Sequence, residues 1–294
     1  MKEPVFTGVA TAIVTPFVKN EIDFEGFDLI LARQMQAGVS AVVVCGTTGE
    51  ASTLSTEEKE KLLRHTVEYC AGRCKVIAGV GTNSTASSVR LAALAASCGA
   101  DALLAVTPYY NKASQAGLAA HYFAIADATS LPLITYNVPS RTGVNLLPET
   151  CLKLSRHPNI NGVKEASGSI SQVARILSLC GEDFNVWSGN DDQITATMAL
   201  GGKGVISVLS NIRPRITVEI ADACLHQDYS ASAALQCAYM PLIDALFSDV
   251  NPIPVKAALK DMGVCEETLR LPLTPMDAEK RMKLRAAQLT CPER

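Results

Sequence analysis

Aromatic residues and positive charge are both scarce in this chain of 294 residues. Phenylalanine, tyrosine and tryptophan make up 5% of the sequence, and the formal net charge is −3 at pH 7. Proteins that bind single-stranded nucleic acid stack the bases on aromatic side chains, and nucleic-acid binders in general need a basic surface. The composition therefore predicts no nucleic-acid partner.

Cysteine occurs ten times, but without the spacing typical of a metal or redox site. The sequence contains no Cys-x-x-Cys, and its four histidines form no His-Glu-x-x-His motif. Several cysteines lie in apolar runs, as at Cys45 and Cys98, which favours small buried side chains. Ten cysteines are also too few for a disulfide scaffold of this length. We predict no metal, unpaired thiols and a reducing, cytoplasmic location.

Long hydrophobic runs are missing as well. A membrane-spanning helix needs roughly 18 consecutive apolar residues, and the nearest candidate, residues 91–106, is interrupted by Gly99 and Asp101. Residues 5–17 resemble the apolar part of a signal peptide, but Glu3 precedes them, three threonines interrupt them and Pro16 lies near their end. A buried first strand explains this segment better. We predict neither a membrane partner nor a cleaved leader.

The sequence alternates short apolar, β-branched runs with stretches whose apolar residues recur every three to four positions. This alternation indicates a parallel sheet covered by helices. Eight such units by residue 226 predict an α/β fold, a closed (β/α)8 TIM barrel. An open doubly wound sheet is the alternative, but the glycine-rich fingerprint that usually follows its first strand is missing. The predicted strands are residues 9–15, 41–45, 75–80, 102–106, 133–136, 161–164, 185–188 and 204–208.

Helix signals support this assignment. Ser55 and Glu58 form a predicted capping box before residues 59–70, and Gly38 and Gly99 follow helices at the position where glycine is favoured. The predicted barrel helices include residues 24–36, 56–70, 86–98, 115–128, 169–180 and 191–200, and another helix opens at Pro148. Beyond residue 226 only helices are expected, at 229–247, 254–262 and 277–289. We therefore predict a catalytic barrel at 1–226 and a C-terminal helical extension at 227–294.

Lys164 is the most informative residue at the carboxyl ends of the predicted strands, where functional residues of such barrels lie. Strand alternation places it on the face shared with Gly162 and Ile160, opposite Val163. If that face points into the barrel, burial lowers the pKa of the amine and makes it a nucleophile toward carbonyls. Alternatively, the ammonium points to water or pairs with Glu165.

Four further residues lie at the same predicted barrel mouth. Tyr136 ends the adjacent strand and can pass protons, unless its hydroxyl is bonded within the core. Thr47 and Thr48 lie between glycines, where free amides can bind a carboxylate, unless they form a simple turn. Arg141 can fork onto a carboxylate, unless it is merely solvated. Together these residues suit Schiff-base chemistry on a small carbonyl compound that carries a carboxylate.

Seven motifs of the chain resemble those of one family, the dihydrodipicolinate synthases of the pyruvate-dependent class I aldolase (N-acetylneuraminate lyase) superfamily. The Ser-Arg-Thr-Gly loop and the paired tyrosines are the more specific part of the resemblance. The motifs, in order along nearly the whole chain, are GTTGE at 46–50, VTPYYN at 106–111, YNVPSRTG at 136–143, GVKEA at 162–166, GGKGVIS at 201–207, NPIPVK at 251–256 and LPLTP at 271–275.

The resemblance implies a reaction and its catalytic residues. Lys164 would form an imine with pyruvate, and Tyr136, Thr47 and Tyr110 would relay protons, with Tyr110 donated by a neighbouring subunit. The implied assembly is a homotetramer, a dimer of dimers, and no cofactor beyond the covalent imine is expected. The enamine would then attack L-aspartate 4-semialdehyde to give 4-hydroxy-tetrahydrodipicolinate, the first committed step of diaminopimelate and lysine biosynthesis.

The resemblance also implies residues that bind substrate. Thr48 and nearby amides would hold the pyruvate carboxylate, with Gly189 and Ile206 lining the pocket. Arg141 would bind the carboxylate of aspartate semialdehyde and help to place Tyr136.

Lysine-inhibited members of the family carry a regulatory cleft, and its positions can be matched in this sequence. They correspond to Ala51, Ser52, Thr56, Lys59, Asn83, Ser87 and Tyr109. Many of those members place a carboxylate at the position of Ser87 to meet the lysine ammonium, and often a neutral side chain at that of Lys59. Serine supplies no charge and Lys59 adds a like charge, so we predict little or no inhibition by lysine.

Two alternative functions follow from the same residues. The chain could be another pyruvate-dependent aldolase, acting on N-acetylneuraminate or a 2-keto-3-deoxy sugar acid, although Arg141 argues against this. It could also be a ligand sensor that has lost catalysis, although the complete set of predicted catalytic residues argues against that.

Overall fold

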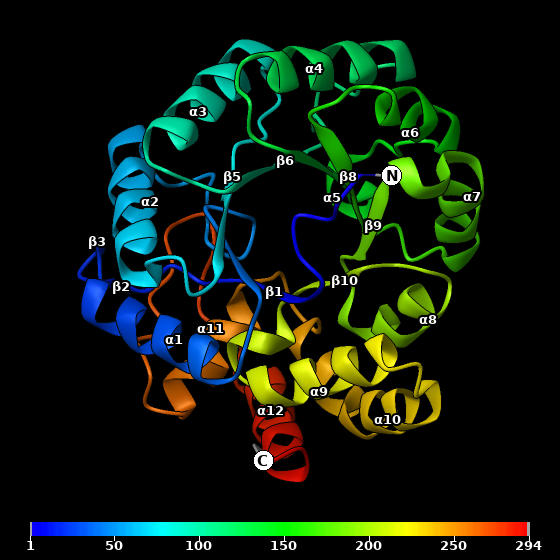
Figure 1. Cartoon of the computed structure of the whole chain (residues 1–294). Helices are drawn as coiled ribbons and strands as arrows, with labels where there is room; N and C mark the ends of the chain where they lie inside the picture. The colour runs from blue at the N-terminus through cyan, green and yellow to red at the C-terminus, as the bar shows by residue number, and fades with distance from the viewer. Residues whose placement is uncertain (1, 293–294) are drawn as a thin grey trace.

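The computed structural model describes residues 2–292, and its centre is a closed barrel of eight parallel strands (Figure 1). Each strand pairs with the next one along the chain, and β10 closes the barrel by pairing with β1. The predicted fold class is therefore confirmed. The barrel strands are β1 (Gly8–Ala12), β4 (Ala41–Val44), β5 (Lys75–Gly79), β6 (Ala102–Val106), β7 (Leu133–Asn137), β8 (Ile160–Glu165), β9 (Asn185–Ser188) and β10 (Gly204–Ser207).

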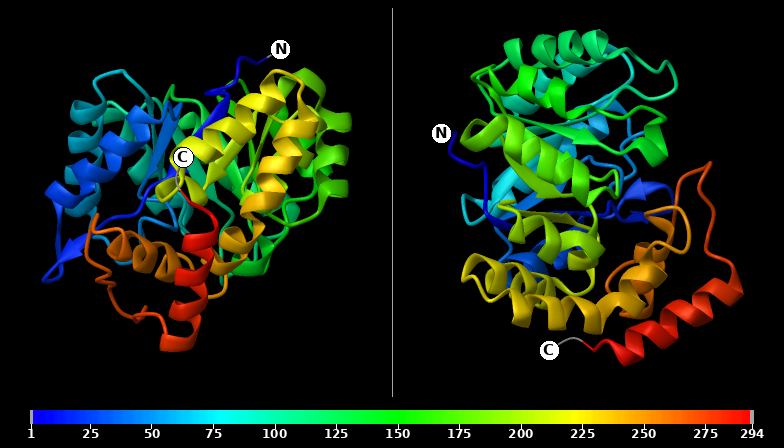
Figure 2. Two further views of the ribbon diagram at one scale, coloured as in Figure 1. Left: turned by 90° about the horizontal axis from the view of Figure 1, so that it is seen from below. Right: turned by 90° about the vertical axis from the view of Figure 1, so that its right-hand side faces the viewer.

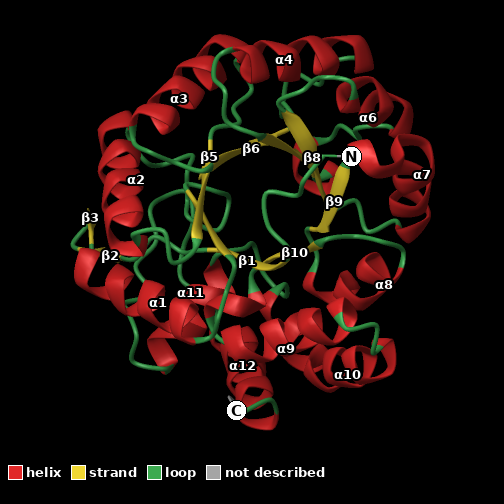
Figure 3. Ribbon diagram, in the orientation of Figure 1, coloured by secondary structure: helices red, strands yellow, loops and turns green. Residues whose placement is uncertain are grey.

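Helices form a ring outside the strands (Figure 3). Because the strands are covered on the outside by helices and filled on the inside by side chains, nearly every strand residue is buried. Predicted and observed bounds agree within about two residues for most helices. The ring consists of α1 (Phe24–Gln36), α2 (Thr56–Cys70), α3 (Thr85–Ser97), α4 (Gln115–Asp127), α6 (Pro148–Ser155), α7 (Ile170–Cys180), α8 (Ile194–Ala199) and α9 (Pro214–Leu225).

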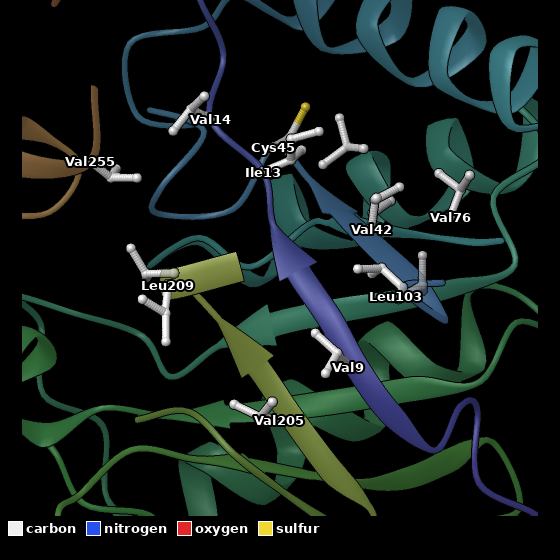
Figure 4. Close-up of a cluster of buried hydrophobic side chains, with 14 of the residues drawn as sticks. Val9, Ile13, Val14, Val42, Cys45, Val76, Leu103, Val205, Leu209 and Val255 are labelled. Carbon is white, nitrogen blue, oxygen red and sulfur yellow. The ribbon is translucent and has the colours of Figure 1, made fainter. Parts of the chain in front are cut away.

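Side chains from alternate strand positions form two separate cores. One cluster fills the barrel and includes Ile134, Tyr136 and Trp187. The larger cluster lies between strands and helices and includes Val9, Val42 and Val205 (Figure 4).

The sequence placed Ile160 on the face of Lys164, and this detail is wrong. Ile160 belongs to the outer cluster together with Val163. The pairing of β7 with β8 slips at this point, because Leu133 faces Ile160 while the next residue, Ile134, faces Gly162. Such a bulge inserts one residue and breaks the strict alternation of faces.

The predicted helix signals are confirmed. Ser55 and Glu58 form the reciprocal capping box at the start of α2. Gly38 and Gly99 follow α1 and α3 with φ of 80° and 85°, a conformation that glycine adopts without strain. One helix differs from expectation, since the segment predicted at 191–200 divides into a 3-10 turn, η2 (Asp191–Gln193), and the shorter α8.

In the part of the chain that the structure describes, up to residue 292, three helices follow the barrel: α10 (Tyr229–Leu246), α11 (Ile253–Asp261) and α12 (Ala278–Thr290). α10 packs on α8 and α9, and α12 packs on α10 and α11. Figure 2 shows α11 and α12 beside the barrel, displaced toward the end opposite the N-terminus. The division of the chain at residue 226 stays a prediction. Among the helices of residues 2–292, none is both long and apolar enough to cross a membrane.

Candidate active site

A cavity of about 510 Å³ opens at the carboxyl ends of the barrel strands. Its wall includes side chains from the ends of β4, β7 and β8 and from the loops that follow β6 and β9. Six of the eight residues predicted to be catalytic or to bind substrate line it, and they are Thr47, Thr48, Tyr136, Arg141, Lys164 and Gly189.

Lys164 lies near the end of β8 and is only 6% exposed. Its Nζ lies 4.3 Å from the centroid of the Tyr136 ring, because the two residues are register partners on neighbouring strands. Burial lowers the pKa of Lys164 to about 7; the carboxylate of Asp191 opposes this shift and the guanidinium of Arg141 adds to it. An amine with such a pKa is largely uncharged just above neutral pH and can attack a carbonyl.

The Glu165 carboxylate bonds other groups and does not pair with Lys164, as one alternative had it. The Glu165 carboxylate accepts hydrogen bonds from the Ser167 amide at 2.7 Å, from Gln172 Nε2 at 3.0 Å and from Asn137 Nδ2 at 3.0 Å. Its hydrogen bonds therefore go to the segment that follows β8 and to the neighbouring strand. The amine of Lys164 is left to face the cavity.

Tyr136 is buried at the end of β7, with its ring against the amine. Burial raises the pKa of its hydroxyl, while the charge of Arg141 and a hydrogen bond with the Thr47 side chain lower it. The hydroxyl is therefore linked to a residue of the cavity wall rather than bonded within the barrel core. This arrangement fits a group that passes protons between the amine and a bound ligand.

Thr47 and Thr48 lie in a tight turn after β4. Thr48 is buried, and its Oγ1 accepts a hydrogen bond of 2.9 Å from Asn251 Nδ2. The turn is closed by the amide of Glu50, which donates to the Thr47 carbonyl at 3.0 Å. The start of this turn packs closely on Gly79 of β5. Only glycine fits there, because a Cβ would lie 2.1 Å from the Cys45 carbonyl oxygen.

A buried ion pair connects this turn to α11 of the C-terminal extension. Lys256 Nζ donates to Glu50 and, at 2.7 Å, to the Thr268 carbonyl, and the Arg270 amide donates to the other Glu50 oxygen at 3.1 Å. Sequence reasoning missed this contribution of the C-terminal extension. The only available signal was that NPIPVK recurs as a family motif.

Arg141 was expected in a polar loop, but it lies in a one-turn helix, α5 (Pro139–Thr142), directly after β7. Pro139 at the first turn favours this helix, and Gly143 ends it with φ of 70°. The Thr142 hydroxyl bonds the Val144 carbonyl at 3.0 Å and ties the turn to the chain that follows. The guanidinium remains exposed at the cavity rim, where it can meet a second carboxylate.

Two predicted residues do not line the cavity. Ile206 is fully buried in the barrel core, and Val208 forms the wall at this strand end. Tyr110 has a φ of 71° and is 90% exposed, so its ring lies in solvent and not in the wall of this cavity. Their assigned roles stay predictions.

The residues matched to a regulatory cleft divide into two groups. Ala51, Ser52, Lys59 and Tyr109 line the same cavity as Lys164. The other three residues, Thr56, Asn83 and Ser87, lie at or near the starts of α2 and α3. Ser87 Oγ accepts a hydrogen bond of 3.0 Å from Arg90, which adds a second cation to this region.

Asp191 is a functional candidate that was not predicted from the sequence, although it lies shortly after the end of β9. It is 1% exposed, and its charge acts on Lys164. Within residues 2–292, no group of three or more histidine, cysteine or acidic side chains is arranged to hold a metal ion.

The fold and the site together define a barrel enzyme with a buried amine of lowered pKa at its mouth. The family model described as the dihydrodipicolinate synthetase family matches residues 5–289. A 4-hydroxy-tetrahydrodipicolinate synthase of Exiguobacterium sibiricum is 51% identical over 92% of each chain. The solved dihydrodipicolinate synthase of Thermotoga maritima is 44% identical, covers 98% of this chain and 99% of its own, and superimposes with a TM-score of 0.96.

A second solved structure, of a monomeric dihydrodipicolinate synthase variant, is 45% identical over 98% of this chain and 97% of its own, with a TM-score of 0.96. The chain therefore belongs to the dihydrodipicolinate synthetase family. It is an enzyme of the lyase class that acts at the first step of lysine and diaminopimelate synthesis. The family assignment favours this reaction over the sugar-acid aldolase alternative.

Proposed function

We propose that this enzyme condenses pyruvate with L-aspartate 4-semialdehyde through a Schiff base on Lys164. The observation that carries the proposal is the buried Lys164 amine, whose pKa is lowered to about 7 and which faces a cavity large enough for both substrates. A lysine of this kind is a nucleophile near neutral pH without a metal or an added cofactor.

The first half of the reaction builds the imine. The Lys164 amine adds to the ketone carbon of pyruvate, and water leaves to give a cationic imine. Thr48 and amides of the turn after β4 hold the pyruvate carboxylate, while Tyr136 and Thr47 pass the protons that the added oxygen requires to leave as water. Loss of a methyl proton then gives the neutral enamine.

The second half joins the two substrates. The enamine carbon attacks the aldehyde of aspartate semialdehyde, whose carboxylate is held by Arg141 at the cavity rim. The amino nitrogen of that substrate then attacks the imine carbon and expels Lys164, which gives 4-hydroxy-tetrahydrodipicolinate. Gly189 leaves room for the lysine chain, because a Cβ there would lie 3.0 Å from Lys164 Cε.

We also propose that Tyr110 acts in a neighbouring subunit and that the enzyme is a homotetramer. The exposure of Tyr110 supports this placement, because the residue does not line the cavity of its own chain. A cytoplasmic location is supported by the ten cysteines, all of which are free thiols.

Borohydride trapping tests the proposed function. Pyruvate followed by borohydride should inactivate the enzyme and leave one pyruvate-derived adduct, which peptide mass mapping should place on Lys164. The trapped enzyme should no longer use aspartate semialdehyde. Modification of Lys203 or Lys256 in place of Lys164 would overturn the assignment.

A further inference from the structure

The Asp191 carboxylate is buried behind the cavity wall with one oxygen free. Its Oδ2 accepts hydrogen bonds from the amides of Val208 at 3.0 Å and Leu209 at 2.9 Å. Within residues 2–292, no donor lies within 3.5 Å of its Oδ1 in hydrogen-bonding geometry, although the Ser207 hydroxyl is near enough to the carboxylate to lower its pKa. Leaving a buried carboxylate oxygen without a partner is costly, so the free oxygen needs an explanation.

Asp191 lies where its charge reaches the reacting amine. It follows the end of β9, whose Trp187 is the register partner of Lys164. Gly189, two residues before Asp191, approaches Lys164 so closely that an added Cβ would lie 3.0 Å from Cε. The carboxylate of Glu165 is already held by other donors, which leaves Asp191 as the buried carboxylate whose charge acts on Lys164.

We propose that Asp191 is a positioning residue that acts as the counter-ion of the cationic imine formed on Lys164. The proposal rests on the function proposed above. When the amine adds to the ketone and water leaves, the nitrogen gains a double bond to carbon and a full positive charge in a buried site. A buried cation requires an anion nearby, and the charge disappears when a methyl proton leaves to give the enamine.

The charges around both groups support this assignment. The groups that act on Lys164 are Asp191, which favours its cationic form, Arg141, which disfavours it, and the Tyr136 ring, which lies 4.3 Å from Nζ. Burial raises the pKa of Asp191, and the Ser207 hydroxyl, the two amides and Lys164 lower it. Asp191 therefore favours whichever form of Lys164 carries positive charge.

The test is the pH dependence of pyruvate–borohydride trapping in Asp191→Asn, which is nearly isosteric and can still accept both amide hydrogen bonds. We expect the plateau rate to fall about tenfold or more. We also expect the pH of half-maximal trapping to move downward by about half a unit or more, because Lys164 loses the anion that favours its ammonium form. Asp192→Asn is the matched control, since this neighbouring carboxylate is exposed, and it should change neither quantity.

A lower plateau rate with an unchanged pH midpoint would overturn the inference. An upward shift of the midpoint would also overturn it, because that is the result expected if the substitution merely loosens the site, hydrates Lys164 and raises its pKa. If the wild-type adduct lies on another lysine, the proposed function itself fails. If it lies on Lys164 while Asp191→Asn leaves the midpoint unchanged, only the counter-ion role fails.

A second measurement does not depend on whether the variant folds. In a crystal structure of the reduced wild-type adduct, whose secondary amine is cationic at neutral pH, we expect an Asp191 oxygen within about 4–6 Å of the lysine nitrogen. A larger separation would overturn the inference.

Discussion

Two buried lysines lie in two different regions of this protein. One region is the mouth of the barrel, and the other, here called the seam, is the contact between Glu50 in the turn after β4 and the C-terminal extension. Lys164 occupies the mouth and Lys256 the seam. Both Nζ atoms lie 4.3 Å from the centroid of an aromatic ring, Tyr136 in one region and Phe17 in the other. Burial lowers the pKa of both amines. Desolvation alone therefore does not distinguish a nucleophile from a structural cation.

The partners distinguish them. Lys256 is fully buried in an ion pair with Glu50 and a hydrogen bond to the Thr268 carbonyl, so its charge is balanced and two of its three N–H donors are used. Lys164 faces a cavity, and the nearby carboxylate of Asp191 has one oxygen free. A buried lysine therefore becomes reactive where burial is combined with open space and an incomplete set of partners.

The largest expected difference between the regions is in turnover. Lys164→Ala should lower the rate of condensation by several orders of magnitude, because the covalent route is lost. Lys256→Met should still form the pyruvate adduct wherever it remains folded, as judged by circular dichroism. A coupled assay with both substrates measures the difference. Substantial turnover by Lys164→Ala would show that the two regions have been assigned the wrong roles.

The stability of the folded protein should depend more on Lys256 than on Lys164. Lys256→Met leaves Glu50 buried without its partner, so the free energy of unfolding should fall by about 3–5 kcal/mol. Lys260→Met, which removes an exposed pair with Glu266, should cost at most about 1 kcal/mol. Adding Glu50→Gln to Lys256→Met should recover part of the loss. Denaturant unfolding checks all three, and equal losses for the two single variants would contradict the comparison.

At the barrel mouth, loss of Arg141 should affect the two substrates differently. Arg141→Ala should weaken use of aspartate semialdehyde by about 10- to 150-fold, the value of a charge-assisted hydrogen bond to a carboxylate. Borohydride trapping of pyruvate should change much less. The ratio of the two effects is the measurement. Equal losses would mean that Arg141 acts only through folding or through Tyr136.

The pH dependence of imine formation should follow the lowered pKa of Lys164. With a pKa of about 7, the uncharged amine is nearly complete at pH 8 and is the minor form at pH 6. The rate of trapping at fixed pyruvate should therefore fall about tenfold from pH 8 to pH 6. A rate that keeps rising steeply up to pH 10 would show an ordinary, hydrated lysine.

The smallest expected effect is that of added lysine. Ser87 carries no charge, its hydroxyl is bonded by Arg90, and Lys59 adds a cation to the adjoining cavity wall, so the ammonium of lysine finds no favourable partner. Titration of lysine into the tens of millimolar should leave turnover nearly unchanged. Half-inhibition below about 1 mM, or roughly −4 kcal/mol of binding, would show that other groups replace the missing carboxylate.

The barrel and most of its mouth could be predicted from the amino-acid sequence. Apolar strands alternating with helices admit few folds, and in a barrel every strand end meets at one face. Lys164 and Tyr136 could therefore be placed together from their positions at strand ends, and the structure pairs them as register neighbours. Local signals such as the capping box at Ser55 depend only on residues a few positions apart.

The groups that surround the two lysines could not be predicted from the sequence, because they come from distant parts of the chain. Glu50 and Lys256 are 206 residues apart, and no periodicity connects them. The bulge that moves Ile160 to the outer face depends on how β7 and β8 fit together, and Asp191 becomes a partner of Lys164 only because β8 and β9 are neighbours. The pKa of an ionisable group depends on burial and on charges a few ångströms away. Those distances exist only once the barrel has closed.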